Sequence, residues 1–98
     1  MDYVWDEKKA RINFSKHGIR FEEAQIIWTD PNAIEYFDPD YMSSEMRLIR
    51  IGLNPSRGLL LVVFCERESQ EAIRIISARK ATNQEKREYE EELQSQRT

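Results

Sequence analysis

The stretch Leu59-Leu-Leu-Val-Val-Phe-Cys-Glu66 is the most apolar run in this 98-residue chain, and we interpret it as a strand. The turn Asn54-Pro-Ser-Arg-Gly58 precedes it, and a short polar connection over 67–70 follows it. Connections this short and polar join antiparallel neighbours. We therefore predict that 59–66 is the central strand of an antiparallel sheet.

Further strands are predicted around this central one, at 33–38, 45–53 and 72–77, with Tyr3–Trp5 as a candidate edge strand. Helices are predicted at 7–17 and 21–29, and a last helix begins at Thr82. The expected fold class is α+β, with two N-terminal helices packed on a four-stranded antiparallel sheet, or five strands if the edge strand forms, and a C-terminal helix. Ninety-eight residues suit one domain, which we expect to span 1–98.

The predicted helix ends carry recognisable capping residues. Asp6 is a suitable N-cap for the first helix, and Gly18 lies where a left-handed residue would end it. The pair Asp30-Pro31 ends the second helix. Thr82 and Glu85 have the spacing of a capping box, so the last helix should start there.

Composition favours a cytoplasmic protein. It has no apolar run of about 18 residues, the length that would span a membrane. The N-terminal sequence Met-Asp-Tyr-Val-Trp lacks the basic and then apolar order of a signal peptide. The lone cysteine, Cys65, cannot form an internal disulfide, and we expect it to be a packed core thiol.

Charge is strongly segregated along the chain. Residues 21–46 carry seven acidic and no basic side chains, whereas 47–80 carry seven basic and three acidic ones. A basic block inside a protein of net charge −3 indicates a local anion site rather than a basic surface overall. Alternatively, the two blocks face each other in the fold and their charges cancel.

The hairpin turns allow the strand register to be estimated. Centring them puts Arg50 opposite Val62 and Phe64 opposite Arg74. One face is then wholly apolar and should receive the two N-terminal helices, while the other carries Arg50 and Arg74. That mixed face is either a binding surface or the surface that the last helix covers, with its glutamates pairing the arginines.

The segment Arg74-Ile-Ile-Ser-Ala-Arg-Lys-Ala-Thr82 combines a strand, an Arg79-Lys80 pair and a helix start. Clustered cations beside a helix N-terminus are well suited to hold a phosphate. They are a poor choice for stability alone, because like charges repel.

Three sequence blocks resemble the BrnT family, the toxin half of a bacterial type II toxin–antitoxin pair. They are Trp5-Asp6 with Lys16-His17-Gly18; Phe21-Glu22-Glu23-Ala24 with Asp30-Pro31; and Glu66-Arg67 with 74–80 and Tyr89. The resemblance covers about residues 4–92 and implies a fold like that of the RelE-type ribonucleases. It further implies that the chain inhibits translation and growth until a BrnA-type ribbon–helix–helix antitoxin neutralises it. Operator DNA would be contacted only through that antitoxin complex.

The resemblance implies metal-independent RNA cleavage without a cofactor. The 2′-hydroxyl then attacks the phosphorus, and the enzyme stabilises negative charge and moves two protons. Arginine suits charge stabilisation because its fork matches two phosphate oxygens. We expect Arg79 and Arg74 in this role, with Lys80 or Arg67 assisting, although about 20 Å should separate Arg67 from Arg79.

The general base is open between two candidates. Glu45 could act as base, or could simply pair with Arg67 across the predicted hairpin. His17 has a suitable intrinsic pKa, but it could equally cap or pack the end of its helix. Lys16, Arg47 and Arg50 are the expected RNA-binding residues, Arg50 on the register estimate alone.

Other functions are weaker alternatives. The chain could be a non-catalytic interaction module, a degenerate toxin that binds an antitoxin-like partner through its acidic block. Direct DNA binding is disfavoured because no predicted helix has a strongly basic face. The acidic residues between 35 and 45 match no calcium loop, so no metal site is expected. Arg20 stands where the family tends to have a small capping residue, which should weaken the start of the second helix.

Overall fold

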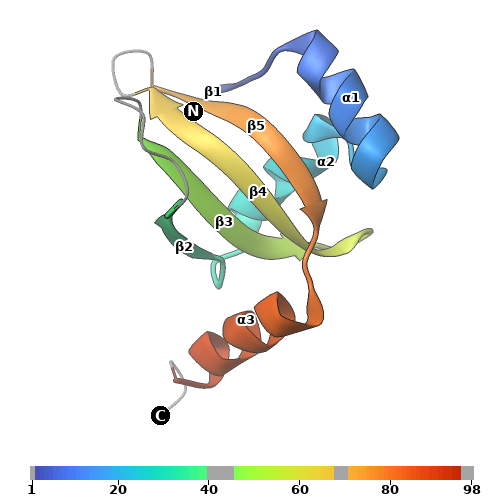
Figure 1. Cartoon of the computed structure of the whole chain (residues 1–98). Coiled ribbons are helices and arrows are strands. Elements are labelled where there is room, and N and C mark those ends of the chain that lie inside the picture. The colour runs from blue at the N-terminus through green and yellow to red at the C-terminus, as the bar shows by residue number, and fades with distance from the viewer. Residues whose placement is uncertain (1, 40–45, 68–70, 96–98) are drawn as a thin grey trace.

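The computed structural model describes residues 2–39, 46–67 and 71–95, which form a five-stranded sheet with helices around it (Figure 1). The order of strands across the sheet is β1-β5-β4-β3-β2. The elements are β1 (Asp2–Val4), α1 (Glu7–His17), α2 (Phe21–Gln25), the 3-10 helix η1 (Ile26–Thr29), β2 (Ile34–Phe37), β3 (Arg47–Asn54), β4 (Gly58–Arg67), β5 (Ala72–Lys80) and α3 (Asn83–Ser95). The α+β class is confirmed, and β4 is the central strand, as its apolar sequence predicted.

The sheet is mixed rather than purely antiparallel. The short strand at the N-terminus, β1, forms and runs parallel to β5, with Tyr3 beside Ile73. The remaining strands pair as antiparallel neighbours. The prediction of a four-stranded antiparallel sheet was therefore incomplete, because β1 reaches the far edge of the sheet rather than extending a hairpin.

The capping signals of α1 and α3 are confirmed. The Asp6 side chain accepts a hydrogen bond from the Lys9 backbone, and Gly18 adopts a left-handed conformation with φ of 70°. At α3, the Thr82 backbone N–H donates to Glu85 Oε1 at 2.8 Å, and the Glu85 N–H donates to Thr82 Oγ1 at 3.2 Å. Both helices thus begin where local side chains satisfy their first backbone donors.

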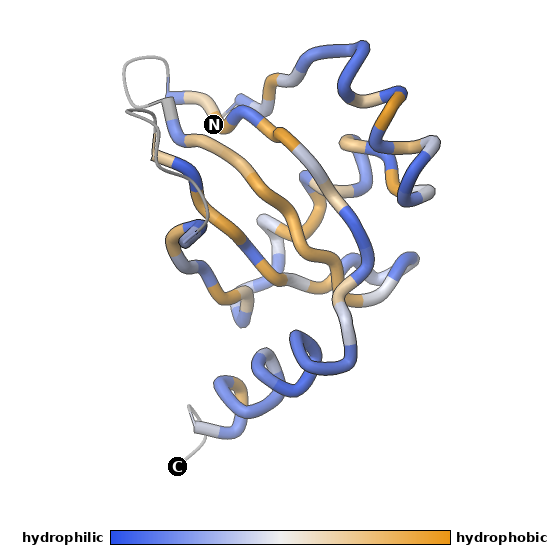
Figure 2. The backbone as a smooth tube through the Cα atoms, in the orientation of Figure 1, coloured by the Kyte–Doolittle hydropathy of each residue, from blue (hydrophilic) through white to orange (hydrophobic). Residues whose placement is uncertain are grey.

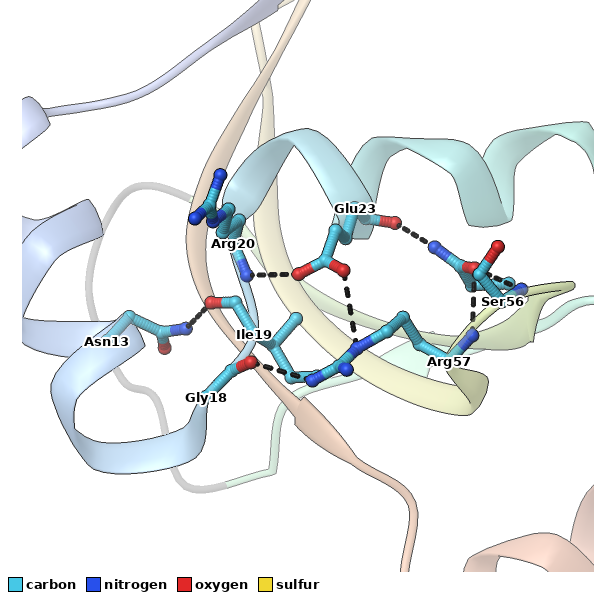
Figure 3. A network of polar contacts seen from close by, with 8 residues as sticks. Asn13, Gly18, Ile19, Arg20, Glu23, Ser56 and Arg57 are labelled. Atoms are coloured by element: carbon cyan, nitrogen blue, oxygen red, sulfur yellow. Dashed lines mark hydrogen bonds and ion pairs between the residues drawn. The ribbon is translucent and has the colours of Figure 1, made fainter.

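The second predicted helix is divided into α2 and η1. Arg20 offers no side-chain acceptor, yet its backbone N–H donates to Glu23 Oε1 at 2.9 Å, which gives half of a capping box. Glu23 also pairs with Arg57 at 3.2 Å, and Arg57 donates to the carbonyl of Gly18 at 2.8 Å (Figure 3). The turn before β4 therefore stabilises the helix start that Arg20 leaves poorly capped.

The register between β4 and β5 differs from the prediction by one residue at the hairpin, and a β-bulge in β5 shifts it by one more. Arg50 lies opposite Val62, as predicted, but Phe64 lies opposite Ile75 and Cys65 opposite Arg74. The shift falls between Val63 and Phe64, so Ile76 has no partner on β4. Phe64 was paired with the wrong residue because Arg67 pairs with Ala72 rather than with Glu71, as the centring had assumed. Counting from the turn could not reveal the bulge, because a bulge inserts one position without altering a hairpin loop.

On β3 and β4 the two faces of the sheet are the reverse of the prediction, whereas Ile73 and Ile75 of β5 lie on the helix-covered face as predicted. The face that α1 and α2 cover, here the α1/α2 face, carries Leu48, Leu60, Val62, Phe64, Ile73 and Ile75 against Ile19, Phe21, Ala24 and Ile27. In Figure 1, α2 passes behind the strands on this side. The prediction failed because both faces of β4 are apolar, so periodicity alone could not choose between them.

Gly52 explains why the helices lie on the α1/α2 face. A Cβ at this position would lie 2.9 Å from Cβ of Ile27 and 3.2 Å from Cβ of Ala33. Only glycine allows η1 to approach β3 this closely, and a glycine inside a strand is typical of such close approach. The position of Gly52 in the sequence was therefore an available signal for the covered face.

Aromatic side chains complete this core. Trp28 packs edge-on against Phe64 with ring centroids 4.9 Å apart, and Trp5 packs against Phe21 at 5.9 Å. Both tryptophans therefore belong to the helix–sheet core.

The opposite side of the sheet, here the α3 face, packs against α3 through a smaller cluster. Ile51, Leu61 and Tyr89 form its buried centre. The Tyr89 hydroxyl donates to Asp30 Oδ2 at 2.7 Å, which ties α3 to the chain just before β2. Figure 2 shows that α3 is otherwise largely hydrophilic, in contrast to the apolar central strands. Within the described part of the chain, no helix is long and apolar enough to cross a membrane.

Candidate functional site

Arg79 lies near the end of β5, on the α3 face, where it pairs with Leu61. Its guanidinium makes a two-pronged ion pair with Glu85: Nη1 to Oε1 at 2.8 Å and Nη2 to Oε2 at 2.9 Å. Nη1 also donates to the carbonyl of Lys80 at 3.2 Å. The side chain remains 37% exposed, so part of the guanidinium is open to solvent.

Charge on both partners is stabilised by this contact. The hydrogen bond with Arg79 holds the pKa of Glu85 below its usual value, although partial burial opposes the shift. The same hydrogen bond raises the pKa of Arg79. Glu85 is thus ionised at neutral pH, and Arg79 presents a fixed cation beside the start of α3.

The bulge at Ile76 brings Arg74 and Arg79 onto one face. Five positions separate them, so a regular strand would place them on opposite faces. In the structure Arg74 pairs with Cys65 and Arg79 pairs with Leu61, and these two residues of β4 share the α3 face. About 13 Å separates the two arginines along the strand, with Ser77 between them.

The last turn of α1 carries further basic residues beside the bulge in β5. A shallow hollow of about 180 Å³ lies between α1 and the edge of β5. Lys9, Ile12, Asn13, Lys16, His17, Ile76 and Ser77 line it. Lys16 and His17 therefore lie beside the bulge, and Ser77 connects the hollow to the face that carries Arg74 and Arg79. Of the predicted residues, Lys16 and His17 therefore line the hollow beside the bulge, while Arg74 and Arg79 lie on the α3 face of the same strand.

Other predicted site residues lie elsewhere. Arg67 pairs with Ala72 at the opposite end of β4 from Leu61, the partner of Arg79, so about 20 Å separates the two arginine positions. Lys80 is exposed, but it pairs with Leu60 and so lies on the α1/α2 side at the end of the sheet. Glu45 lies outside the described residues.

Arg50 is a correction to the predicted RNA-binding set. It lies on the α1/α2 face, where it forms an ion pair with Glu35 and stacks over Trp28 at 5.1 Å. Its side chain is only 15% exposed. The predicted exposed face with Arg50 and Arg74 together does not exist, because the two arginines lie on opposite sides of the sheet.

Arg47 lies on the same face as Arg74. Cys65 pairs with Arg47 on one side and with Arg74 on the other, so the two arginines lie two strands apart, roughly 10 Å. Arg47 also pairs with Asp38 at 3.8 Å. Cys65 itself is buried, as predicted.

Sequence reasoning missed several residues of this region. Tyr36 pairs with Ile49 and so belongs to the α3 face. Burial raises the pKa of its phenol, the charges of Glu85 and Glu88 raise it further, and Arg79 lowers it, so Tyr36 lies within electrostatic range of that ion pair. Lys9 and Ser77 were also missed, since only the α1–β5 contact reveals them. Among residues 2–39, 46–67 and 71–95, no three His, Cys, Asp or Glu side chains gather as metal ligands would.

Comparison with known proteins gives a consistent family match. The profile of the ribonuclease toxin BrnT of type II toxin–antitoxin systems matches residues 5–85. The structure is similar to the crystal structure of the ribonuclease toxin BrnT of Brucella abortus, with a TM-score of 0.64 and 28% sequence identity. That similarity covers 85% of this chain and 99% of the Brucella chain. None of the curated proteins matches the chain at a significant level.

Proposed function

Because the chain belongs to the BrnT family of ribonuclease toxins from type II toxin–antitoxin systems, we propose that it cleaves RNA without a metal ion. The proposed toxin domain is the whole of residues 1–98. The observation that carries the proposal is the bulge at Ile76, which places Arg74 and Arg79 on one face of the sheet, while Lys16 and His17 line a hollow that reaches the bulge. Stability alone does not require two arginines on one face of a strand beside further basic residues, whereas binding of a polyanion does.

The proposed chemistry is attack by a 2′-hydroxyl on the adjacent phosphorus. The attacking oxygen loses its proton, the bond to the 5′-oxygen breaks, and that oxygen takes up a proton. Extra negative charge develops on the non-bridging oxygens during the step. Arg79 and Arg74 stabilise this charge. A guanidinium that is already in position when the charge develops needs no reorganisation during the reaction.

His17 is the first candidate for the acid–base group. It borders the hollow beside Ser77, between the levels of the two arginines on β5. An imidazole has one nitrogen that can accept a proton and one that can give it, which suits both proton transfers. Glu45 remains the second candidate for the base.

Further basic residues bind the parts of the RNA on either side of the cleavage site. Lys9 and Lys16 line the hollow, and Lys80 is exposed at the end of β5. Arg47 extends the basic row across the sheet from Arg74. Arg67 lies too far away to share the phosphate of Arg79, so we place it on a distant part of the RNA.

We further propose the biological setting that the family implies. The toxin acts in the cytoplasm, inhibits translation and growth, and is neutralised by a BrnA-like ribbon–helix–helix antitoxin. Operator DNA is contacted by the antitoxin within the complex.

The direct experiment is an RNA cleavage assay with the purified chain in the presence of EDTA. We expect cleavage to persist and to leave 2′,3′-cyclic phosphate ends, the product of attack by the 2′-hydroxyl. Arg87→Ala is a suitable control, because Arg87 is an exposed arginine on α3 whose guanidinium hydrogen-bonds to the neighbouring Gln84. Cleavage that EDTA abolishes would contradict metal independence. No cleavage at all, from a folded chain that still binds an antitoxin, would favour the non-catalytic interaction module instead.

A further inference from the structure

Arg79 uses its guanidinium hydrogens unevenly, and this leaves one fork unused. Arginine carries five N–H donors in a rigid plane: one on Nε and two on each of Nη1 and Nη2. One hydrogen of Nη1 and one of Nη2 point at Glu85, and the second Nη1 hydrogen points at the Lys80 carbonyl. The hydrogens on Nε and the outer side of Nη2 have no acceptor among the described residues. These two run parallel, in the arrangement that binds two oxygens of one phosphate.

We propose that Glu85 is a positioning residue that holds Arg79 so that this side fork grips the RNA phosphate at the cleavage site. The inference rests on the proposed ribonuclease function. It adds an acidic residue, which the basic side chains alone would not indicate. Glu85 does not contact the phosphate in this role. It acts by fixing the plane of the guanidinium.

Glu85 is itself fixed by the start of α3. Its Oε1 accepts from both Arg79 and the Thr82 backbone N–H, and its own N–H donates to Thr82 Oγ1. The carboxylate side chain is only 15% exposed. The Glu85 carboxylate thus accepts three hydrogen bonds, two from Arg79 and one from the Thr82 N–H, and cannot rotate freely. The start of α3 therefore sets the orientation of the Arg79 guanidinium.

A competing interpretation is that Glu85 blocks Arg79 from RNA. Removal of the block would then strengthen RNA binding and speed cleavage together. The geometry favours positioning, because Glu85 occupies the end of the guanidinium and leaves the side fork accessible. The two interpretations predict opposite changes in cleavage rate, so one variant separates them.

The decisive variant is Glu85→Gln. Glutamine retains a carbonyl oxygen that can accept from the Thr82 N–H, so the capping box persists. It cannot accept two hydrogen bonds from Arg79, because its amide nitrogen is a donor. Glu90→Gln is the matched control: Glu90 lies on the same helix, is exposed, and undergoes the same change in charge.

Four quantities are measured on each protein: Tm, kcat and KM for RNA cleavage, and Kd for a short 2′-O-methyl RNA that cannot be cleaved. We expect Glu85→Gln to lower kcat by about tenfold or more, since small misplacements of a catalytic group are costly. We expect Kd to change by less than about threefold, because the charge of Arg79 remains. Glu90→Gln should match the wild type in kcat.

Two further measurements make the inference falsifiable. In an Arg79→Ala background, Glu85→Gln should cause no additional loss of kcat, since a positioning residue acts only through Arg79. An unchanged or faster kcat in folded Glu85→Gln, or a further loss in the Arg79→Ala background, would overturn the inference. If the wild type cleaves no RNA, the proposed function fails separately. The NMR signal of the Arg79 Nε–H then still tests positioning, because that signal should shift and broaden in Glu85→Gln but not in Glu90→Gln, and no such difference would overturn it.

Discussion

Asn13 exchanges two hydrogen bonds with the backbone of Ala78. Its Nδ2 donates to the Ala78 carbonyl at 2.9 Å, and its Oδ1 accepts from the Ala78 N–H at 3.0 Å. Nδ2 also donates to the carbonyl of Ile19 at 3.0 Å, as Figure 3 shows. The side chain thus closes the edge of β5 beyond the short strand β1, where the buried backbone groups of Ala78 would otherwise be unpaired. It also fixes the last turn of α1, which carries Lys16 and His17, beside the bulge.

Replacing Asn13 should therefore cost more than an ordinary surface mutation. Asn13→Ala leaves the Ala78 N–H and carbonyl buried without partners, and we expect the free energy of unfolding to fall by about 3 kcal/mol. Chemical denaturation measures this change. Asn83→Ala, at an exposed position in the first turn of α3, should stay within about 0.5 kcal/mol. A loss for Asn13→Ala as small as that of the control would show that water can replace the contact.

The hydrogen bond from Tyr89 to Asp30 should stabilise the docking of α3. Tyr89→Phe removes only the hydroxyl, and we expect a loss of about 2 kcal/mol, since the acceptor is charged. Burial and the neighbouring Asp30 raise the pKa of Tyr89 to about 12. The stabilisation is therefore complete below pH 10 and disappears as pH rises towards 12. In denaturation measured across this range, the wild type and Tyr89→Phe should converge; a constant difference would mean that the hydroxyl is not the cause.

The Arg79–Glu85 pair should weaken in acid. The pKa of Glu85 is lowered from 4.5 in the folded protein, chiefly by its hydrogen bond with Arg79. Its contribution to stability is therefore present above pH 4.5 and disappears as pH falls through the folded pKa. Other carboxylates titrate equally in the wild type and in Glu85→Gln, so the difference between them reports on Glu85. We expect that difference to shrink below about pH 4.5 in urea denaturation. A difference that stays constant down to pH 3 would be inconsistent with an ionised pair.

Gly52 tests the assignment of the covered face. In Gly52→Ala the new methyl group would lie against Ile27, and we expect a loss of about 1–3 kcal/mol from overpacking. Ser56→Ala, at an exposed turn position whose side chain forms no hydrogen bond in the described structure, is the control. If the stability of Gly52→Ala equals that of the wild type, η1 does not approach β3 as closely as the structure shows.

Sequence reasoning identified the elements well but not their arrangement in space. Asp6, Gly18 and Thr82 mark helix ends through local hydrogen bonds, so their positions were predictable from neighbouring residues. The faces of the sheet depend on the bulge at Ile76 and on Gly52, which are tertiary features. For the same reason Arg74 and Arg79 could be named as candidates, but their common face could not be derived.

The pairing of Arg79 with Glu85 shows the same limit. The capping box was evident from the spacing of Thr82 and Glu85, yet a capping glutamate has no necessary partner in the preceding strand. Only the extension of β5 to Lys80 brings the guanidinium to the start of α3. The predicted phosphate site therefore contains an internal carboxylate that the sequence did not reveal.

The most direct test of the account compares Arg79→Ala with Arg67→Ala in RNA cleavage by the purified chain. Arg67 ends β4, whereas Arg79 pairs with Leu61 near the other end of that strand, so about 20 Å separates the two positions. Arg79 is the arginine that Glu85 holds beside the start of α3. With folding verified by circular dichroism, Arg79→Ala should lower kcat by about 100-fold, as expected for the loss of one donor to developing charge. Arg67→Ala should leave kcat within about threefold of the wild type and act, if at all, on KM. A wild-type kcat in Arg79→Ala, with the loss found instead in Arg67→Ala, would contradict the account.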